Sequence, residues 1–251
     1  MNKSNKIFLE KYSRQIIMDQ VGIEGQKKIS KSSISIIGCG GLGTSAAQYL
    51  SMSGINNFTL IDNDYVDITN LNRQTLFTEN DIGKKKSKIL SRKIKEINKS
   101  VNINFYEEKV TSSNIQKFIN NNSIVLDCTD NFESRLLINK YCHNNQNILI
   151  SAAIQNFDIQ AFILAPWLHK KNPCYKCIFP ELINDNEASC DEMGIIASVA
   201  GLAGLIQANL TLNFILGLRN NFREFILVDC IKFDLKKILV NKSKDCKICN
   251  S

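Results

Sequence analysis

The sequence predicts an α/β fold, namely a Rossmann-like, doubly wound and mainly parallel sheet that is extended by antiparallel strands. In the first half of the chain, short apolar runs alternate with segments of helical character, and a glycine loop follows the first run. In the second half, apolar runs follow one another mostly without helical crossovers. A chain of 251 residues is long enough for one such domain, so we expect a single domain over 1–251.

The first βαβ unit is expected between residues 34 and 61. The apolar run 34–37 (ISII) predicts a strand, and the glycine loop 38–43 (GCGGLG) follows it directly. The small-residue segment after the loop predicts a helix that ends at Gly54. The run 58–61 (FTLI) predicts the second strand, which ends on Asp62. Strand, glycine turn, helix and strand in this order form one βαβ unit.

The elements that follow continue this alternation. Leu90, Ile94 and Ile97 fall on one face of a helix expected over 84–99. Further strands are expected at 101–105, 124–127 and 148–150, with a helix at 132–143. In the second half we expect strands at 159–164, at 225–228 and in two short runs up to Val240, with a long apolar helix at about 195–217. The stretch 170–193 mixes polar residues, proline and cysteine, which predicts a long loop.

Composition and charge exclude several classes of protein. The N-terminus is polar and lacks the apolar stretch of a signal peptide, which predicts a cytoplasmic protein. The net charge of +7 is not gathered into a basic stripe with aromatic residues, so we expect no nucleic-acid partner. The segment Ile195–Leu218 is long enough to span a bilayer, but polar residues and glycines interrupt it. We therefore expect a buried core helix and no membrane association.

A glycine loop after a strand brings backbone N–H groups and a helix N-terminus against a phosphate. Four loop glycines are predicted to bind a nucleotide, because they remove side chains where the backbone must come close: Gly38, Gly40, Gly41 and Gly43. Asp62 follows Gly43 by 19 residues at a strand end, a spacing that suits hydrogen bonds from ribose hydroxyls. The alternative is a tight turn followed by an unrelated aspartate.

The glycine fingerprint alone does not separate ATP from NAD(P). Polar and charged residues lie beyond the carboxyl ends of the predicted strands, where open α/β sheets bind ligands: Asp64, Asn70, Arg73, Gln74, Lys86 and Asp130. A triphosphate needs such cations and a carboxylate that binds Mg²⁺, whereas a nicotinamide cofactor does not. Taken singly, Arg73 or Lys86 fits a solvated surface charge, and Asp130 fits a helix N-cap. The combination favours ATP.

Four of the nine cysteines form two CxxC pairs, Cys174/Cys177 and Cys246/Cys249. In a reducing compartment this pattern predicts a tetrahedral Zn²⁺ site that ties the predicted loop to the C-terminal tail. Four protein ligands leave no open position, so the zinc is expected to be structural. Redox-active pairs and free thiols are the alternatives.

Several motifs occur in a shared order: RQI (14–16), GCGGLG, the D-x-D-x-V-x-x-x-N-L-x-R-Q stretch, LDCTDN and the CxxC pairs. Together they resemble the ThiF/MoeB/HesA family of sulfur-carrier-protein adenylyltransferases, which is related to ubiquitin-activating enzymes. The similarity runs nearly end to end. It implies ATP-dependent adenylylation of the C-terminal glycine carboxylate of a ubiquitin-like sulfur carrier protein that ends in Gly-Gly. Residues 1–150 would bind the nucleotide, and 151–251 would bind the carrier, with the zinc site and a mobile loop near 178–193.

The resemblance also implies roles for individual residues. The glycine loop and Asp62 would hold ATP, while Asn70, Arg73 and Lys86 would contact its phosphates. Asp130 would bind Mg²⁺. The YSRQI, FTENDIG and APW segments are closer to the thiamin branch, whose carrier is ThiS, than to the molybdopterin branch, whose carrier is MoaD.

Two further residues receive roles from the resemblance. Arg14 would reach the ATP site of a partner subunit, which implies a homodimer. Cys190, in the segment SCDEMG, would be a candidate for a covalent acyl or persulfide intermediate, with a separate sulfur-donor protein as a possible partner. One segment departs from the family pattern. Ala197 and Ser198 stand in GIIASVAG, where relatives usually carry a proline, and this leaves the geometry before the long helix open.

Two other classes of function compete with adenylylation. The dinucleotide-like fingerprint is also typical of an NAD(P)-binding oxidoreductase, although the cations, Asp130 and the lack of an evident proton-transfer motif disfavour it. A non-catalytic module that binds a carrier without activating it is the other alternative. The intact set of Arg73, Lys86 and Asp130 disfavours that reading.

Overall fold

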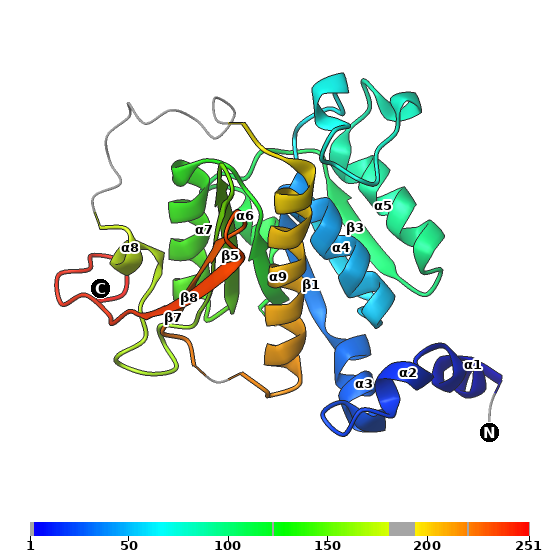
Figure 1. Ribbon diagram of the computed structural model, residues 1–251, viewed down its shortest axis with the longest axis horizontal. Helices are drawn as coiled ribbons and strands as arrows, with labels where there is room; N and C mark the ends of the chain where they lie inside the picture. Colours follow the sequence, from blue (N-terminus) through cyan, green and yellow to red (C-terminus); the bar gives the residue numbers. More distant parts are fainter. Residues whose placement is uncertain (1–2, 122, 181–193, 220, 251) are drawn as a thin grey trace.

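The computed structural model describes residues 3–121, 123–180, 194–219 and 221–250, which surround one mixed sheet (Figure 1). Eight strands pair in the order β3-β2-β1-β4-β5-β6-β7-β8. Strands β3, β2, β1, β4 and β5 are parallel to one another. Strands β6, β7 and β8 extend the sheet with antiparallel pairing. Their bounds are β1 Ser33–Ile37, β2 Asn57–Ile61, β3 Asn102–Tyr106, β4 Ser123–Asp127, β5 Leu149–Gln155, β6 Asp158–Leu164, β7 Glu224–Asp229 and β8 Asp234–Leu239. This arrangement confirms the predicted fold class.

The central strands are buried on both faces. In β1, Ile34 and Ile36 belong to one hydrophobic core, whereas Ile37 belongs to another. Because successive side chains point to opposite faces of a strand, the two cores lie on opposite sides of the sheet. This two-sided burial explains why these strands are nearly continuous apolar runs in the sequence.

Helices cover both faces, as a doubly wound fold requires (Figure 1). Residues of α4, α5 and α9 contribute to the core that contains Ile34, and residues of α6, α7 and α8 contribute to the core that contains Ile37. The helices are α1 Lys3–Lys11, α2 Ser13–Ile16, α3 Gly22–Lys31, α4 Gly41–Ser53, α5 Lys86–Ile97, α6 Ile115–Phe118, α7 Phe132–Asn144, α8 Tyr175–Ile178 and α9 Ala197–Ile215. Helices α1 and α2 extend away from the sheet, while α3 leads into β1 (Figure 1).

Helix α9 is long and apolar enough to cross a membrane, and it is the one described helix that meets this test. It lies against the sheet and α4 instead (Figure 1). A Cβ atom on Gly204 would collide with the backbone oxygen of Leu42 in α4, so glycine allows the two helices to approach closely. The apolar composition of α9 follows from this packing, and the packing confirms the predicted core helix.

Some predicted boundaries were wrong. The two short runs before Val240 form the single strand β8, whose residues are all exposed, so no alternating pattern marks its extent. The helix expected over 84–99 spans Lys86–Ile97, and the strand expected at 101–105 spans Asn102–Tyr106. The first described part of the expected 170–193 loop contains helix α8, and residues 181–193 lie outside the described residues.

A buried carboxylate stabilises the segment between β2 and α5. Asp81 is 1% exposed, and it accepts hydrogen bonds from the backbone N of Thr78 at 3.1 Å and its hydroxyl at 2.9 Å. It also lies 2.7 Å from the Arg92 guanidinium of α5. Burial raises the pKa of Asp81, but the Thr78 and Arg92 contacts outweigh it, so the pKa lies below its ordinary value of 3.8.

We therefore expect Asp81→Ala to lower the free energy of unfolding by about 1–3 kcal/mol. Most of this loss comes from the two hydrogen bonds with Thr78, because Arg92 is half exposed and its charge is screened. A carboxylate with a lowered folded-state pKa stabilises the fold fully above the unfolded-state value of about 3.9. This stabilisation disappears as the pH falls through the folded-state pKa. Urea titrations from pH 7 to pH 3 test this, and a difference between variant and wild type that does not shrink on acidification would contradict it.

Candidate active site

A cavity of about 780 Å³ opens at the carboxyl ends of the parallel strands. It lies at the place where β1 and β4 are neighbours in the sheet, although β2 and β3 come between them in the chain. This place is the topological switch point, where open α/β sheets bind ligands. Most of the residues predicted to bind the nucleotide line it: Gly38, Gly40, Gly41, Asp62, Asp64, Asn70, Arg73, Gln74, Lys86 and Asp130. Gly43 does not.

The glycine loop is shaped by close backbone contacts. Gly38 has a φ of +95°, and a Cβ atom there would lie 2.5 Å from the Cys128 backbone oxygen. A Cβ atom on Gly43 would collide with the Gly38 backbone oxygen. Gly43 therefore allows α4 to pack against the turn, whereas Gly40 and Gly41 leave the cavity wall without side chains. Such a bare wall beside a helix N-terminus fits a phosphate.

Asp62 joins the glycine loop to the end of β2. Its two carboxylate oxygens accept hydrogen bonds from the backbone N–H groups of Cys39, at 2.6 Å, and Asp64, at 2.7 Å. Burial raises the pKa of Asp62, and these two backbone hydrogen bonds offset part of the increase. The carboxylate thus fixes the loop and also faces the cavity, where it can accept hydrogen bonds from a ribose.

The two cations predicted to contact phosphates, Arg73 and Lys86, both line this cavity. The ammonium nitrogen of Lys86 lies 2.9 Å from the Asp64 carboxylate, and the Lys86 side chain is 8% exposed. The Arg73 guanidinium donates to the backbone oxygen of Thr69 at 2.8 Å. The side-chain oxygen of Gln74 is buried without a hydrogen-bond partner among the described residues. The wall therefore offers positive charge, as a nucleotide phosphate site requires, and an unused acceptor oxygen that suits a hydroxyl or amino donor of a ligand.

Asp130 lies on the exposed rim of the cavity, after β4. Its carboxylate accepts a hydrogen bond from the side chain of Asn131 at 3.2 Å. Asn131 caps α7 by accepting from the backbone N of Ser134 at 2.9 Å, so the N-cap is Asn131 rather than Asp130. An exposed carboxylate beside cations and a phosphate site is a suitable Mg²⁺ ligand.

A buried ion pair under the cavity was not predicted. Arg135 and Asp127 are both nearly inaccessible, and the guanidinium lies 3.7 Å from the carboxylate. Arg135 also donates to the backbone oxygens of Thr129 and Ala152, and Asp127 accepts from the Ser151 hydroxyl at 2.8 Å. The pair therefore holds the loop after β4, which carries Asp130, against the middle of β5.

We expect Arg135→Met to lower the free energy of unfolding by about 3–5 kcal/mol, because it leaves the buried Asp127 carboxylate without its cation. Denaturant unfolding of Arg135→Met, Asp127→Asn and the double variant tests the pairing. Because the two residues interact, the double variant should lose less stability than the sum of the two single losses. Additive losses would show that the two side chains act independently.

Gln207 of α9 braces the same place from the opposite side of the sheet. Its amide nitrogen donates to the backbone oxygens of Asp127 at 2.8 Å and Ile150 at 3.3 Å. Its amide oxygen accepts from the Cys128 thiol at 3.2 Å. The end of β4 and the adjoining part of β5 are therefore fixed from both faces. Further polar wall residues that the sequence did not single out include Asn63, Thr69, Glu108, Lys109, Thr129 and Arg135.

Two predicted catalytic residues are not among the described residues that line this cavity. Arg14 is exposed on α2 and does not line the cavity of its own chain. Cys190 lies outside the described residues. Among the other cysteines, Cys39 and Cys128 are buried, and burial raises the pKa of each thiol, which disfavours a reactive thiolate. Cys230 is partly exposed.

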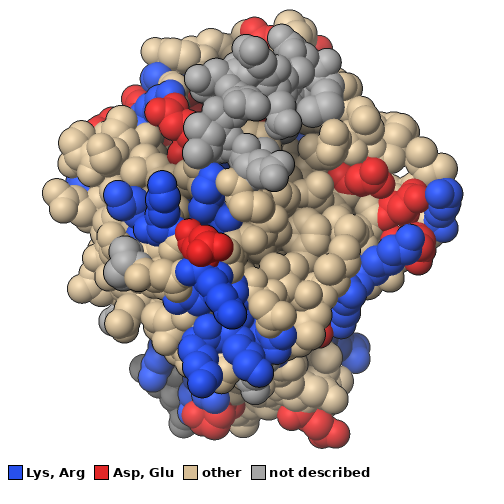
Figure 2. All heavy atoms as spheres, turned by 90° about the vertical axis from the view of Figure 1, so that its left-hand side faces the viewer, with Lys and Arg blue, Asp and Glu red and all other residues tan. Residues whose placement is uncertain are grey.

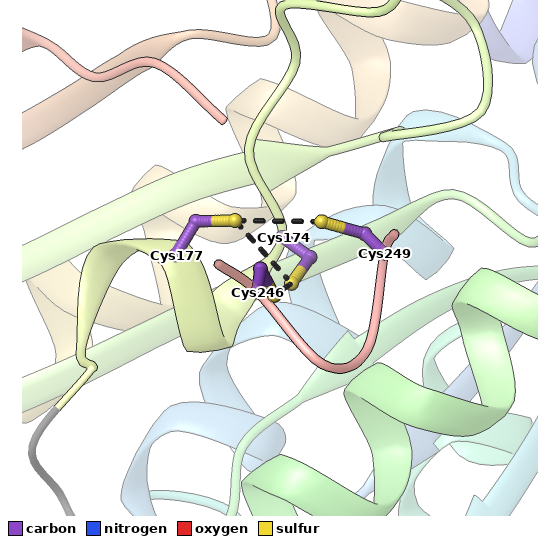
Figure 3. A group of neighbouring side chains, drawn as sticks. All are labelled: Cys174, Cys177, Cys246 and Cys249. Carbon is purple, nitrogen blue, oxygen red and sulfur yellow. Dashed lines mark hydrogen bonds between the residues drawn. The ribbon is translucent and has the colours of Figure 1, made fainter. Parts of the chain in front are cut away.

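The four CxxC cysteines converge at one point (Figure 3). Cys174 and Cys177 flank the start of α8, while Cys246 and Cys249 come from the C-terminal tail. All four sulfur atoms lie within 4.8 Å of one another. The separations include 3.8, 3.5 and 3.4 Å, too long for a disulfide bond of about 2.05 Å. Tetrahedral Zn–S bonds of about 2.3 Å place sulfur atoms about 3.8 Å apart, so this cluster fits Zn²⁺.

The fold and the cavity define an α/β protein of the Rossmann class with a glycine-loop site at its switch point and a four-cysteine cluster that could hold a metal ion. The chain belongs to the ThiF family, whose family model matches residues 12–249. This match confirms the family that the motifs indicated.

Named relatives cover most of the chain. It is 32% identical over 240 residues to the sulfur carrier protein ThiS adenylyltransferase of Escherichia coli (strain K12), covering 95% of this chain and 94% of that protein. It is 35% identical over 219 residues to a probable molybdopterin-synthase adenylyltransferase of Gracilaria tenuistipitata var. liui, covering 87% of this chain and 61% of that protein. The crystal structure of E. coli MccB with MccA-N7isoASN has a TM-score of 0.83 at 23% identity, covers 95% of this chain and 74% of that one, and shows the same fold.

Proposed function

We propose that this chain is an adenylyltransferase that activates the C-terminal glycine carboxylate of a ubiquitin-like sulfur carrier protein with ATP. One observation carries the proposal: a single cavity brings together the bare glycine-loop wall, the Asp62 carboxylate, the cations Arg73 and Lys86, and the rim carboxylate Asp130. Relatives that match more than nine tenths of the chain are named as adenylyltransferases of sulfur carrier proteins, which supports the reaction class.

The chemistry needs positioning and charge more than a base. The carrier carboxylate is ionised at neutral pH, so its oxygen attacks the α-phosphorus without losing a proton first. The new P–O bond forms as the bond to the β-phosphate oxygen breaks, and pyrophosphate leaves. Arg73 and Lys86 would stabilise the charge on the departing phosphates, for which Lys86 exchanges its contact with Asp64. Asp130 would hold Mg²⁺, which neutralises phosphate charge when it is bound.

The carrier is proposed to be ThiS, in thiamin thiazole biosynthesis. The YSRQI, FTENDIG and APW segments support this branch, and so does the match over 94% of the E. coli ThiS adenylyltransferase. The alternative is the MoaD carrier of molybdopterin synthesis, because relatives named as probable molybdopterin-synthase adenylyltransferases match at similar identity. The reaction is the same in both branches, so the partner alone distinguishes them.

We also propose that the active form is a cytoplasmic homodimer. Arg14 is exposed on α2, outside the cavity of its own chain, so its cationic side chain is available to the site of a second copy. Cys190 would attack the acyl adenylate to form a thioester with release of AMP, or would take the outer sulfur of a persulfide on a sulfur-donor protein, whose thiol then leaves. An NAD(P)-linked oxidation is a less suitable reading of the cavity, because Arg73, Lys86 and Asp130 have no role in it.

ATP–pyrophosphate exchange tests the proposal. The purified, zinc-loaded chain is incubated with ATP, Mg²⁺ and labelled pyrophosphate, together with a ThiS-type or a MoaD-type carrier. Exchange with one carrier, and none with the same carrier amidated at its C-terminus, would support adenylylation and identify the branch. No exchange with either carrier, together with tight NADH binding, would replace the proposal by the oxidoreductase reading.

A further inference from the structure

Two turns at one end of the antiparallel strands expose apolar side chains. Phe157 lies in the β5–β6 turn, and Ile231 and Phe233 lie in the β7–β8 turn with Leu235 just beyond it. Their exposed fractions are 41%, 69%, 88% and 56%, respectively. The backbone N of Cys230 donates to the Phe157 oxygen at 3.0 Å, so the two turns lie side by side. We call these four residues the hairpin tip.

The hairpin tip lies at the same edge of the sheet as the cavity. Strand β5 is parallel to β4, so both strands end at the edge of the sheet that carries the cavity, and the β5–β6 turn lies there. Because β6, β7 and β8 pair antiparallel, β7 runs in the same direction as β5, and the β7–β8 turn lies at the same edge. A small core cluster of Ile154, Ala200 and neighbours connects the two features. Ile154 and Ala200 line the cavity, and Cys230 at the hairpin tip packs against the same cluster.

The fold itself does not account for Phe233. Its φ is +56°, a left-handed conformation in which a bulky side chain is strained and asparagine or glycine is favoured. It is also the most exposed large apolar side chain among the described residues. The turn is held by the Asp229 carboxylate, which accepts from the backbone N of Ile231 at 3.0 Å and of Lys232 at 2.9 Å. A strained, exposed aromatic residue on a fixed turn is typical of a binding surface.

We infer that the hairpin tip is the docking surface for an apolar face on the folded body of the carrier protein. The inference rests on the proposed function. A carboxylate at the end of a carrier tail can enter the cavity only if the folded body stays outside, beside the cavity mouth. The hairpin tip is an exposed apolar surface that is connected to the cavity wall through the cluster containing Ile154 and Cys230. An aromatic anchor such as Phe233 loses water on docking and carries much of the binding energy in surfaces of this kind.

The test is Phe233→Asn in full-length protein, with Leu239→Asn as the matched control. Asparagine tolerates the left-handed conformation, so the midpoint of thermal unfolding should stay level or rise. Leu239 is 57% exposed at the opposite end of β8, away from the cavity. We expect Phe233→Asn to raise the KM for the carrier, and its Kd in anisotropy measurements with labelled carrier, about tenfold or more. The KM for ATP and both constants of Leu239→Asn should remain at wild-type values.

Three outcomes would overturn the inference, and they are distinguishable. If the wild-type protein catalyses ATP–pyrophosphate exchange and Phe233→Asn binds the carrier as tightly as wild type does, only the docking role of the hairpin tip is wrong. A Phe233→Asn variant that changes the mass measured by light scattering but not the carrier Kd would assign the hairpin tip to self-association. Wild type that neither exchanges with nor binds ThiS-type or MoaD-type carriers would overturn the proposed function and the docking surface together.

Discussion

Replacing Asp130 by asparagine is expected to reduce ATP–pyrophosphate exchange by about 10²–10³-fold, the range typical for losing one group that stabilises transition-state charge. The carboxylate is exposed on the cavity rim, and its neighbour Asn131 supplies the α7 cap, so the fold does not depend on it. An amide retains the shape of the side chain but removes the negative charge that Mg²⁺ prefers. The loss should therefore appear as a raised Mg²⁺ requirement as well as a lower rate.

Glu133→Gln provides the matched control. Glu133 lies three residues further along, its side chain is 87% exposed, and it does not line the cavity. Exchange should stay near wild type in this variant at every Mg²⁺ concentration. Thermal unfolding should be unchanged in both variants, which separates a lost ligand from a lost fold. If Asp130→Asn exchanged at the wild-type rate under limiting Mg²⁺, the assignment of Asp130 would be wrong.

The cavity could be anticipated from the sequence because its parts obey a local rule. The glycine loop, Asp62 and Asp130 all follow the ends of apolar runs, and parallel strands bring their carboxyl ends to one edge. Lys109 obeys the same rule after β3, so the same reasoning applied there would have found it. The local sequence pattern is thus sufficient to predict those site residues whose position depends only on the direction of the strand before them.

The braces beneath the cavity could not be anticipated in this way. Gln207 contacts the Asp127 backbone across 80 positions in the sequence, and one amide in an apolar helix has no distinctive pattern. Arg135 occupies an ordinary helix position, and its burial depends on the packing of α7 against β5. The hairpin tip was equally hidden, because exposed β8 lacks the alternation that marks a half-buried strand.

Replacing Cys246 by serine is expected to remove the zinc and to lower the free energy of unfolding by about 4 kcal/mol. The cluster joins two segments 72 residues apart, and a covalent cross-link that closes a loop of this length stabilises by a comparable amount. Serine does not replace a thiolate ligand, and three remaining sulfurs hold the ion poorly. Elemental analysis and thermal unfolding, with and without a chelator, measure both effects.

ATP binding should survive the loss of zinc, since the four cysteines do not line the cavity. Helix α8 is also held by a hydrogen bond from the Tyr175 backbone to the Asn139 side chain at 2.9 Å. We therefore expect the KM for ATP to stay near wild type in Cys246→Ser at temperatures below its unfolding transition. Cys230→Ser is the control, because this cysteine lies outside the cluster and its variant should retain zinc. A Cys246→Ser protein with full zinc content and unchanged stability would show that the cluster is not a metal site.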